Sequence, residues 1–274
     1  AVLDNLGYQA MAGAGLRHIM DIEIKALNID FNITDSLTLS SVTQLREMDR
    51  TGGQDQDGSP YDALHAFAGR FSTGEKGGIQ FESLTQELKL ASEFDGPFNF
   101  VLGTSYLEDD NEFTLGYMGI LFGYGLLGRT EHDIESTSYY LDGSYELSNA
   151  LTFTAGVRNT KDEQDLTTFA FGATGRASSS FSDTTYRVVL DYDISDSLMI
   201  YGSFNTGFKS GGYNGSWFGP TPEVEPEEID SFELGAKYTG DSFSFEAAFF
   251  DYDWEKLQVA VLSNDAGGSI QENA

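Results

Sequence analysis

Cysteine, proline and histidine are scarce, because the 274 residues include no cysteine, 5 prolines and 3 histidines. Without cysteine the chain has no disulfide framework, no thiolate metal site and no thiol catalysis. Basic side chains are scarce too, since 15 Lys and Arg stand against 44 Asp and Glu, for a formal net charge of −29. Such a charge repels phosphate backbones, so we expect no nucleic-acid partner.

Long hydrophobic runs are also missing. The longest weakly polar run, residues 116–128, is shorter than the about 18 residues that a transmembrane helix needs. Residues 1–16 lack the basic start of a signal peptide, so we expect the chain to be trimmed or to begin in mid-protein. A membrane location stays open, because a closed β-barrel also satisfies every backbone group in lipid.

The sequence does contain a repeated hairpin. Five short polar turns are each followed by an apolar residue that opens a strand of alternating apolar and polar residues. These apolar residues are Leu37, Phe98, Leu151, Leu198 and Phe243. The pattern predicts ten strands, at 19–31, 37–48, 83–93, 98–108, 136–146, 151–161, 184–192, 198–209, 228–238 and 243–259, and an eleventh starting at Gln271. Ile22 and Ile24 are out of phase with Leu27 and Ile29, which predicts a bulge in the first strand.

The connections alternate between short turns and four long loops, at 49–82, 109–135, 162–183 and 210–227. This organisation is typical of an all-β, antiparallel transmembrane β-barrel with short periplasmic turns and long extracellular loops. An aromatic residue precedes each strand start, as in the girdle at the lipid headgroups of such barrels, although Tyr and Phe are also ordinary strand residues. These residues are Phe31, Phe94, Tyr145, Tyr192 and Tyr238. We expect the acidic side chains in the long loops and the lumen, because an unpaired carboxylate in hydrocarbon is costly.

Residues 198–214, LMIYGSFNTGFKSGGYN, closely resemble a barrel strand and the following loop of TonB-dependent outer-membrane receptors. Other segments are similar to supporting motifs of the family: 226–227, 231–237, 247–254, 85–92 and 155–160. The resemblance implies a barrel of about 22 strands around a plug. The chain shows no plug motif and no terminal aromatic residue, so we expect residues 1–274 to be an internal part of the β-barrel domain, without the plug domain and the C-terminal strands.

The resemblance implies TonB-energised uptake of a scarce solute, such as a ferric siderophore, haem, cobalamin or a glycan, across the outer membrane of a Gram-negative bacterium. The expected partners are outer-membrane lipid and lipopolysaccharide, the TonB complex through the missing N-terminal region, and a small-molecule substrate; no cofactor is expected. A passive or structural barrel is the alternative. A ten-stranded outer-membrane hydrolase is disfavoured, because histidine meets a carboxylate only at His132 beside Asp133 and at His65 near Asp62, and no nucleophile motif is present.

The loop at 210–227 is the candidate ligand site, because its aromatic and amide side chains can stack on and hydrogen-bond to a bulky solute. These side chains are Tyr213, Asn214, Trp217 and Phe218, of which the last two could equally anchor at the outer lipid interface. On the polar strand faces we expect lumenal cations paired with acids such as Asp142, Asp191 and Glu233; the cations are Arg158, Arg187 and Lys209. Oxygen-rich segments at 54–58 and 108–112 are incomplete as calcium loops, so no metal site and no catalytic residue is predicted.

Overall fold

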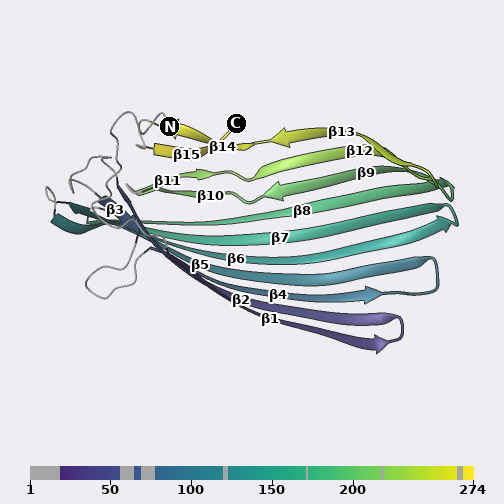
Figure 1. Ribbon diagram of the computed structural model, residues 1–274, viewed down its shortest axis with the longest axis horizontal. Coiled ribbons are helices and arrows are strands. Elements are labelled where there is room, and N and C mark those ends of the chain that lie inside the picture. The colour runs from purple at the N-terminus through teal and green to yellow at the C-terminus, as the bar shows by residue number, and fades with distance from the viewer. Residues whose placement is uncertain are drawn as a thin grey trace.

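The fold is all β in the computed structural model, which describes residues 19–55, 65–68, 78–119, 123–170, 172–216, 219–263 and 268–274. A single curved antiparallel sheet of 11 strands dominates it (Figure 1). Within the described ranges, no helix has the length and apolar character needed to cross a membrane. The predicted all-β, antiparallel fold class is confirmed.

The strands follow one another around the sheet. They are β1 (Ile19–Thr34), β2 (Leu37–Asp55), β3 (His65–Ala68), β4 (Ile79–Ser92), β5 (Phe98–Gly119), β6 (Gly123–Ser148), β7 (Leu151–Ala170), β8 (Ala173–Ser195), β9 (Leu198–Lys209), β12 (Glu227–Thr239) and β13 (Ser244–Glu255). The short strand β3 pairs with the ends of β2 and β5, and β4 lies between the same two strands. Two small hairpins stand apart: β10 (Gly212–Ser216) with β11 (Gly219–Val224), and β14 (Gln258–Ser263) with β15 (Gly268–Asn273).

All five predicted short turns join neighbouring strands at one end of the sheet, which we call the turn end (right in Figure 1). Backbone hydrogen bonds join turns to the neighbouring strand, as from Asp193 N to Ala150 O at 2.8 Å and from Thr239 N to Ser197 O at 2.9 Å, and Gly240 N donates to Phe243 O at 3.0 Å within the β12–β13 turn. The small hairpins and β3 lie at the opposite end, which we call the mouth end (Figure 1). The five short turns are therefore confirmed at one end, whereas long connections at the other end remain only between β2 and β4 and between β9 and β12.

Two of the predicted long loops are wrong. Residues 109–135 and 162–183 continue the ladders of β5–β6 and β7–β8 almost to their tips, where Gly172 adopts φ +84° in the turn. Both faces of these extensions carry polar residues, so the alternation that marks a half-buried strand disappears there. The backbone ladder does not depend on that alternation, because N–H and C=O groups pair regardless of the side chains.

The predicted irregularities at the two ends of the sequence are also wrong. β1 pairs with β2 in continuous register from Ile19↔Thr51 to Asn32↔Thr38, so Ile22 and Leu27 lie on opposite faces without a bulge between them. The final strand begins at Gly268 rather than Gln271, and it pairs with β14 instead of extending the main sheet beyond β13.

One face of the sheet is apolar in its turn-end half. Directly opposed residues share a face, and one row of them crosses seven strands: Phe31, Leu39, Leu90, Leu102, Leu141, Val157 and Tyr186. A second row contains Phe98, Tyr145, Phe153 and Leu190. These side chains have no covering layer within the described structure; Phe31, for example, is 62% exposed. Such a band suits lipid as its solvent.

The residues predicted for an aromatic girdle lie at the turn-end border of this band. Phe31, Tyr145, Tyr192 and Tyr238 are paired with Leu39, Phe153, Leu151 and Phe245, so all four belong to the apolar face. Phe94 lies in the turn before β5, and its ring centroid is 6.2 Å from that of Phe100.

Candidate functional site

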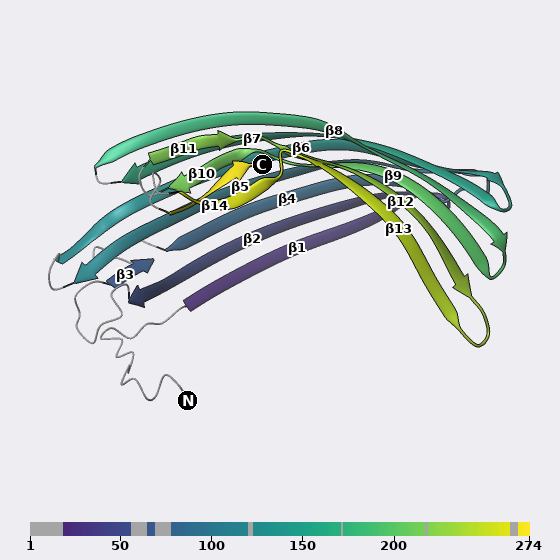
Figure 2. The ribbon, with the colours of Figure 1, turned by 90° about the horizontal axis from the view of Figure 1, so that it is seen from above.

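The opposite face is polar and lies inside the curve of the sheet, where the β10–β11 hairpin sits beside β7 and β8 (Figure 2). Tyr140 of β6 lies across this polar face. Its hydroxyl donates a hydrogen bond to Glu87 Oε1 at 2.6 Å. Its ring covers Gly103, where a Cβ would lie only 2.3 Å from Tyr140 Cζ. The Arg158 guanidinium stands 5.5 Å from the ring centroid and donates to Ser105 Oγ at 3.1 Å.

The same arrangement recurs on β9 and β12. Tyr201 covers Gly235, where a Cβ would lie 2.5 Å from the ring. The Tyr201 hydroxyl donates to Glu233, and Lys237 Nζ lies 5.4 Å from the ring centroid. In both places a tyrosine fills the space above a glycine, its hydroxyl reaches a carboxylate, and a cation covers its ring. The polar face is therefore preorganised by its own contacts.

The three cations expected in the lumen all lie on this polar face. Arg158 is engaged by Tyr140, and Arg187 approaches Asp142 with Nη1 3.7 Å from Oδ2. Asp142 and Arg187 are each opposed to Gly156, where a Cβ would meet Asp142 Oδ2 at 2.4 Å. Lys209 is opposed to Glu227. Neighbouring side chains of the sheet therefore hold Arg158 and Arg187, whereas Lys209 is placed opposite Glu227 by the strand register alone.

The candidate ligand loop is largely the β10–β11 hairpin. Tyr213 is the second residue of β10, and the single proton of its hydroxyl is within reach of two acceptors, Ser178 O at 2.9 Å and Glu223 Oε2 at 3.0 Å. Burial raises the pKa of Tyr213, and the bond to Glu223 raises it further, so the hydroxyl keeps its proton at neutral pH. Asn214 lies in β10, whereas Trp217 and Phe218 lie outside the described residues.

The sequence pattern missed the side chains beneath this hairpin. Gln164, Leu166 and Thr168 of β7 and Phe181 of β8 are among the most buried side chains of the described chain. Gln164 Nε2 donates to Gly211 O at 2.9 Å. The alternation of 162, 164, 166 and 168 along one face would have revealed them, had residues 162–183 been treated as strand.

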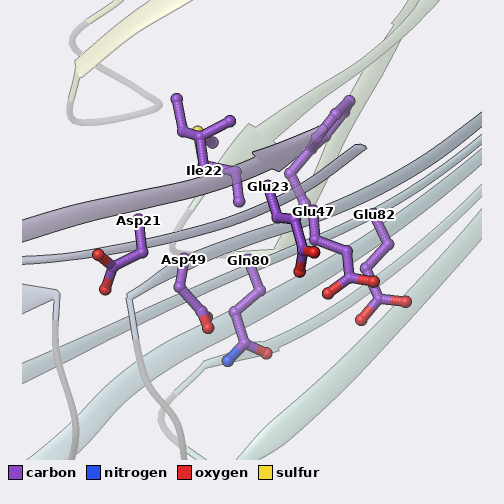
Figure 3. Close-up of a pocket in the computed structure, with 9 residues that line it drawn as sticks. Asp21, Ile22, Glu23, Glu47, Asp49, Gln80 and Glu82 are labelled. Carbon is purple, nitrogen blue, oxygen red and sulfur yellow. The ribbon is translucent and has the colours of Figure 1, made fainter. Parts of the chain in front are cut away.

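Carboxylates gather on the outward side of the sheet, between the apolar band and the mouth end. One row of directly opposed residues contains six: Glu23, Glu47, Glu82, Asp110, Asp133 and Asp165. Asp21 and Asp49 form the next row, and Figure 3 shows these side chains of β1, β2 and β4 on one side of the sheet with Ile22 on the other. They border a shallow depression of about 280 Å³. We call the six-residue row the acidic row.

The acidic row corrects the expectation that acids would gather in loops and the lumen. Its residues stand on strands and face away from the concave side. Asp133 is opposed to both Asp110 and Asp165. Desolvation raises the pKa of Asp133, and repulsion from Asp110 and Glu131 adds to the effect. Ion pairs lie at one end of the row, between Lys25 and Glu23 at 3.0 Å, and in the neighbouring row, between Lys161 and Glu163 at 2.9 Å.

The residues considered for a hydrolase or a calcium site do not come together in the structure. His132 and Asp133 are consecutive in β6 and therefore point to opposite faces, and His132 Nε2 lies 3.2 Å from Gln164 Oε1. His65 lies in β3, and Asp62 lies outside the described residues. The segment 108–112 is strand, so its acids alternate between faces. Among the described residues no group of His, Asp or Glu is arranged to hold a metal ion.

A sheet with a lipid-suited outer band and a preorganised polar inner face is the wall of a membrane barrel. The family model described as TonB dependent receptor-like, beta-barrel, matches residues 6–274. The chain belongs to this family. TonB-dependent receptors are proteins of the Gram-negative outer membrane, which confirms the predicted family and localisation.

Solved receptor structures share the fold. The ferric yersiniabactin uptake receptor FyuA from Yersinia pestis has a TM-score of 0.74 at 16% identity, over 95% of this chain and 39% of that one. The siderophore receptor PiuA from Acinetobacter baumannii has a TM-score of 0.69 at 18% identity, over 95% and 43% of the two chains. The copper transporter OprC gives 0.68 at 15% identity, also over 95% and 43%. The chain thus spans less than half the length of these receptors. No curated protein sequence matches it.

Proposed function

We propose that the chain forms part of the barrel wall of a receptor that imports a scarce solute across the outer membrane, energised by the TonB complex. The match to the family's barrel model carries this proposal. Residues 1–274 would be one part of the barrel domain, and the plug domain and further strands would come from the rest of the protein. Ferric siderophores, haem, cobalamin and glycans are the candidate substrates.

The concave face supports a transport role through its chemistry. Its tyrosines and cations are held by glutamates and hydroxyls of the wall, as at Tyr140 and Tyr201, so a passing solute meets a water-compatible surface with fixed geometry. Hydroxyl, carboxylate and guanidinium groups can exchange hydrogen bonds with a polar solute. Tyr213, Asn214, Trp217 and Phe218 would contact the solute at the mouth, with the mouth end extracellular.

Uptake by the full-length protein tests the proposal. Cells expressing it, with and without a functional TonB complex, would be given radiolabelled ferric siderophores, haem and cobalamin. The concentrations would be too low for passive diffusion to give measurable uptake. We expect accumulation of one solute class that is lost when the complex is absent. Equal accumulation in both strains would identify a passive barrel instead.

A further inference from the structure

The deepest packing in the described chain lies between the β10–β11 hairpin and the concave face. The buried apolar side chains include Leu166 at 2% exposure and Phe181 at 8%, on β7 and β8, and Val224 at 4%, on β11. A Cβ on Gly211 would lie 2.7 Å from the Phe181 ring and 2.4 Å from Val224 O. The start of the hairpin therefore lies against the wall with no space between them.

A chain of polar contacts crosses the same packing. Gln164, 7% exposed, donates from Nε2 to Gly211 O at 2.9 Å. This bond fixes the orientation of the amide, with Gln164 Oε1 turned toward His132. Because an amide oxygen only accepts, the His132 Nε2–H donates to Oε1 at 3.2 Å. A Cβ on Gly212 would lie 2.9 Å from Gln164 Oε1, so both glycines are needed for the approach. Two strands, β6 and β7, and the start of the hairpin therefore meet at one buried amide.

Both stems of the hairpin are fastened independently of Gln164. Gln258 Nε2 donates to Ser210 O at 3.0 Å and to Glu225 O at 3.1 Å. Asn273 Nδ2 donates to Glu225 O at 2.9 Å, and buried Glu227 accepts from Gln258 N at 2.7 Å. Changing Gln164 would therefore weaken the contact between the hairpin and the wall, which also includes the bond from Tyr213 to Ser178 O and the apolar packing, while the base of the hairpin stays in place.

We propose that Gln164 is a positioning residue that docks the β10–β11 hairpin on the barrel wall as a fixed inner lining, which narrows the mouth. The hairpin occupies space on the concave side that the wall would otherwise leave open (Figure 2). The inference rests on the proposed role of the chain as a transport barrel. It assigns the upper size limit of the passage to the docked hairpin, and it makes the buried Gln164 amide one necessary part of the docking, beside the apolar packing and the Tyr213 bond.

Gln164→Glu in the full-length receptor tests the docking. The carboxylate keeps an acceptor for His132 but cannot donate to Gly211 O, whereas the protonated carboxyl can. The surrounding groups are His132 on β6, Asp162 on β7, uncharged Ser179 opposite on β8 and the two hairpin glycines. Docking in this variant should therefore be lost at neutral pH and recovered in acid, a response that lost packing alone does not give.

The measured quantity is the rate at which a thiol reagent labels Val224→Cys. At each pH this rate is divided by that of Leu262→Cys, because Leu262 is 90% exposed in the parent protein and reports the reactivity of an accessible thiol. We expect the ratio to rise at least about tenfold in Gln164→Glu at neutral pH, because a buried charged group without its bond is costly, and to fall again in acid. The control is Gln44→Glu, because Gln44 is half-buried on the polar face of β2. This variant should leave the labelling ratio unchanged. An unchanged ratio in Gln164→Glu, or an equal rise in Gln44→Glu, would overturn the docking role.

Hydrogen exchange of residues 211–224 in Gln164→Glu, without added cysteines, covers the case in which Val224→Cys itself disturbs the packing. Faster exchange at neutral pH supports the role, and parental exchange contradicts it.

The narrowing is tested by labelling Thr160→Cys, on the concave face, in intact cells. A polyethylene-glycol-linked maleimide should react faster after Gln164→Glu, while a small maleimide should not; equal rates for the large reagent would refute the narrowing. These assays need no uptake, so they stay separate from the transport proposal.

Discussion

At the scale of single residues, the polar face depends on glycines that accept aromatic rings. Gly103 and Gly235 lie beneath Tyr140 and Tyr201, and neither has room for a methyl group. A tyrosine ring over a glycine restores the packing that a strand glycine lacks and shields its backbone. The ring in turn places its hydroxyl on a carboxylate, so the choice of glycine determines the position of a polar group on the opposite strand.

Gly235→Ala should lower the thermal unfolding midpoint of the full-length barrel. The added Cβ would lie 2.5 Å from the Tyr201 ring, and overpacking of this kind costs about 1–3 kcal/mol. Gly202→Ala on neighbouring β9 is the matched control, because its Cβ would make only ordinary contacts, with Leu234 Cδ1 at 3.8 Å and Glu233 O at 3.9 Å. The control should be neutral or stabilising by up to about 1 kcal/mol, since alanine restricts the unfolded chain. Equal losses in both variants would contradict the tyrosine–glycine contact.

Asp133 lies directly between two like charges, because the strand register places it opposite both Asp110 and Asp165. Because desolvation and neighbouring acids raise its pKa in the folded protein, the stabilisation from proton binding is complete below the ordinary pKa and is lost as pH rises through the folded value. Asp133→Asn should therefore stabilise the barrel at neutral pH by about 0.2–1 kcal/mol, the range of a cross-strand pair. The advantage should vanish in strong acid.

The measurement for Asp133→Asn is the thermal midpoint of the full-length protein as a function of pH. Glu163→Gln is the control, because Glu163 is paired with Lys161 at 2.9 Å and loses an attraction when neutralised. A gain for Glu163→Gln equal to that for Asp133→Asn would show that net charge, rather than register, controls the effect.

At the scale of the strand, two faces of one element meet different solvents. β7 places Phe153 on the apolar face, opposed to Tyr145 and Leu190, and Thr152 on the polar face, opposed to Glu146 and Asp191. Beyond the apolar band the outward face of β7 is polar, with Glu163 and Asp165, while its inner face carries Gln164, Leu166 and Thr168 beneath the hairpin. The same ladder of backbone bonds therefore passes from the lipid region into water without a break, because only the side chains change.

Phe153→Lys should destabilise the barrel, but by less than the about 2–4 kcal/mol that a cation costs at the bilayer midplane, because Phe153 is opposed to Tyr145 near the border of the apolar band. Thr152→Lys should cost far less, because its neighbours across the strands are Glu146 and Asp191. Thr154, also on the polar face, is only 8% exposed and is a poorer control. Heat-modifiability of the full-length protein on gels gives the comparison, and a similar loss in both variants would reverse the assigned faces.

At the scale of the whole molecule, the ends of the wall differ in construction. The turn end consists of short closed turns, whereas the mouth end carries the extended ladders and the hairpins (Figure 1). The acidic row surrounds the outside of the mouth end above the apolar band. A surface of this sign repels anionic headgroups unless counterions screen it, so we expect the stability of the mouth end to rise with ionic strength.

Cysteine labelling of intact cells tests the orientation of the molecule. Thr174→Cys, exposed near the β7–β8 tip, should react with a membrane-impermeant thiol reagent. Asp35→Cys, in the β1–β2 turn, should react only after the outer membrane is opened. Reaction of both positions in intact cells would refute the proposed placement of turns and mouth on opposite sides of the membrane.

The strand positions, the short turns and the apolar face were predictable because their signals are local. Turn residues and period-two alternation act over a few neighbouring positions, and the bilayer imposes that alternation on every strand it contacts. The strand extensions at 109–135 and 162–183 were not predictable in this way, because water on both faces removes the alternation while the ladder continues. The outward placement of the acidic row follows from register across six strands. The docking of Gln164 on Gly211 joins residues 47 positions apart, and only the curvature of the sheet and the fold-back of the hairpin decide such a contact.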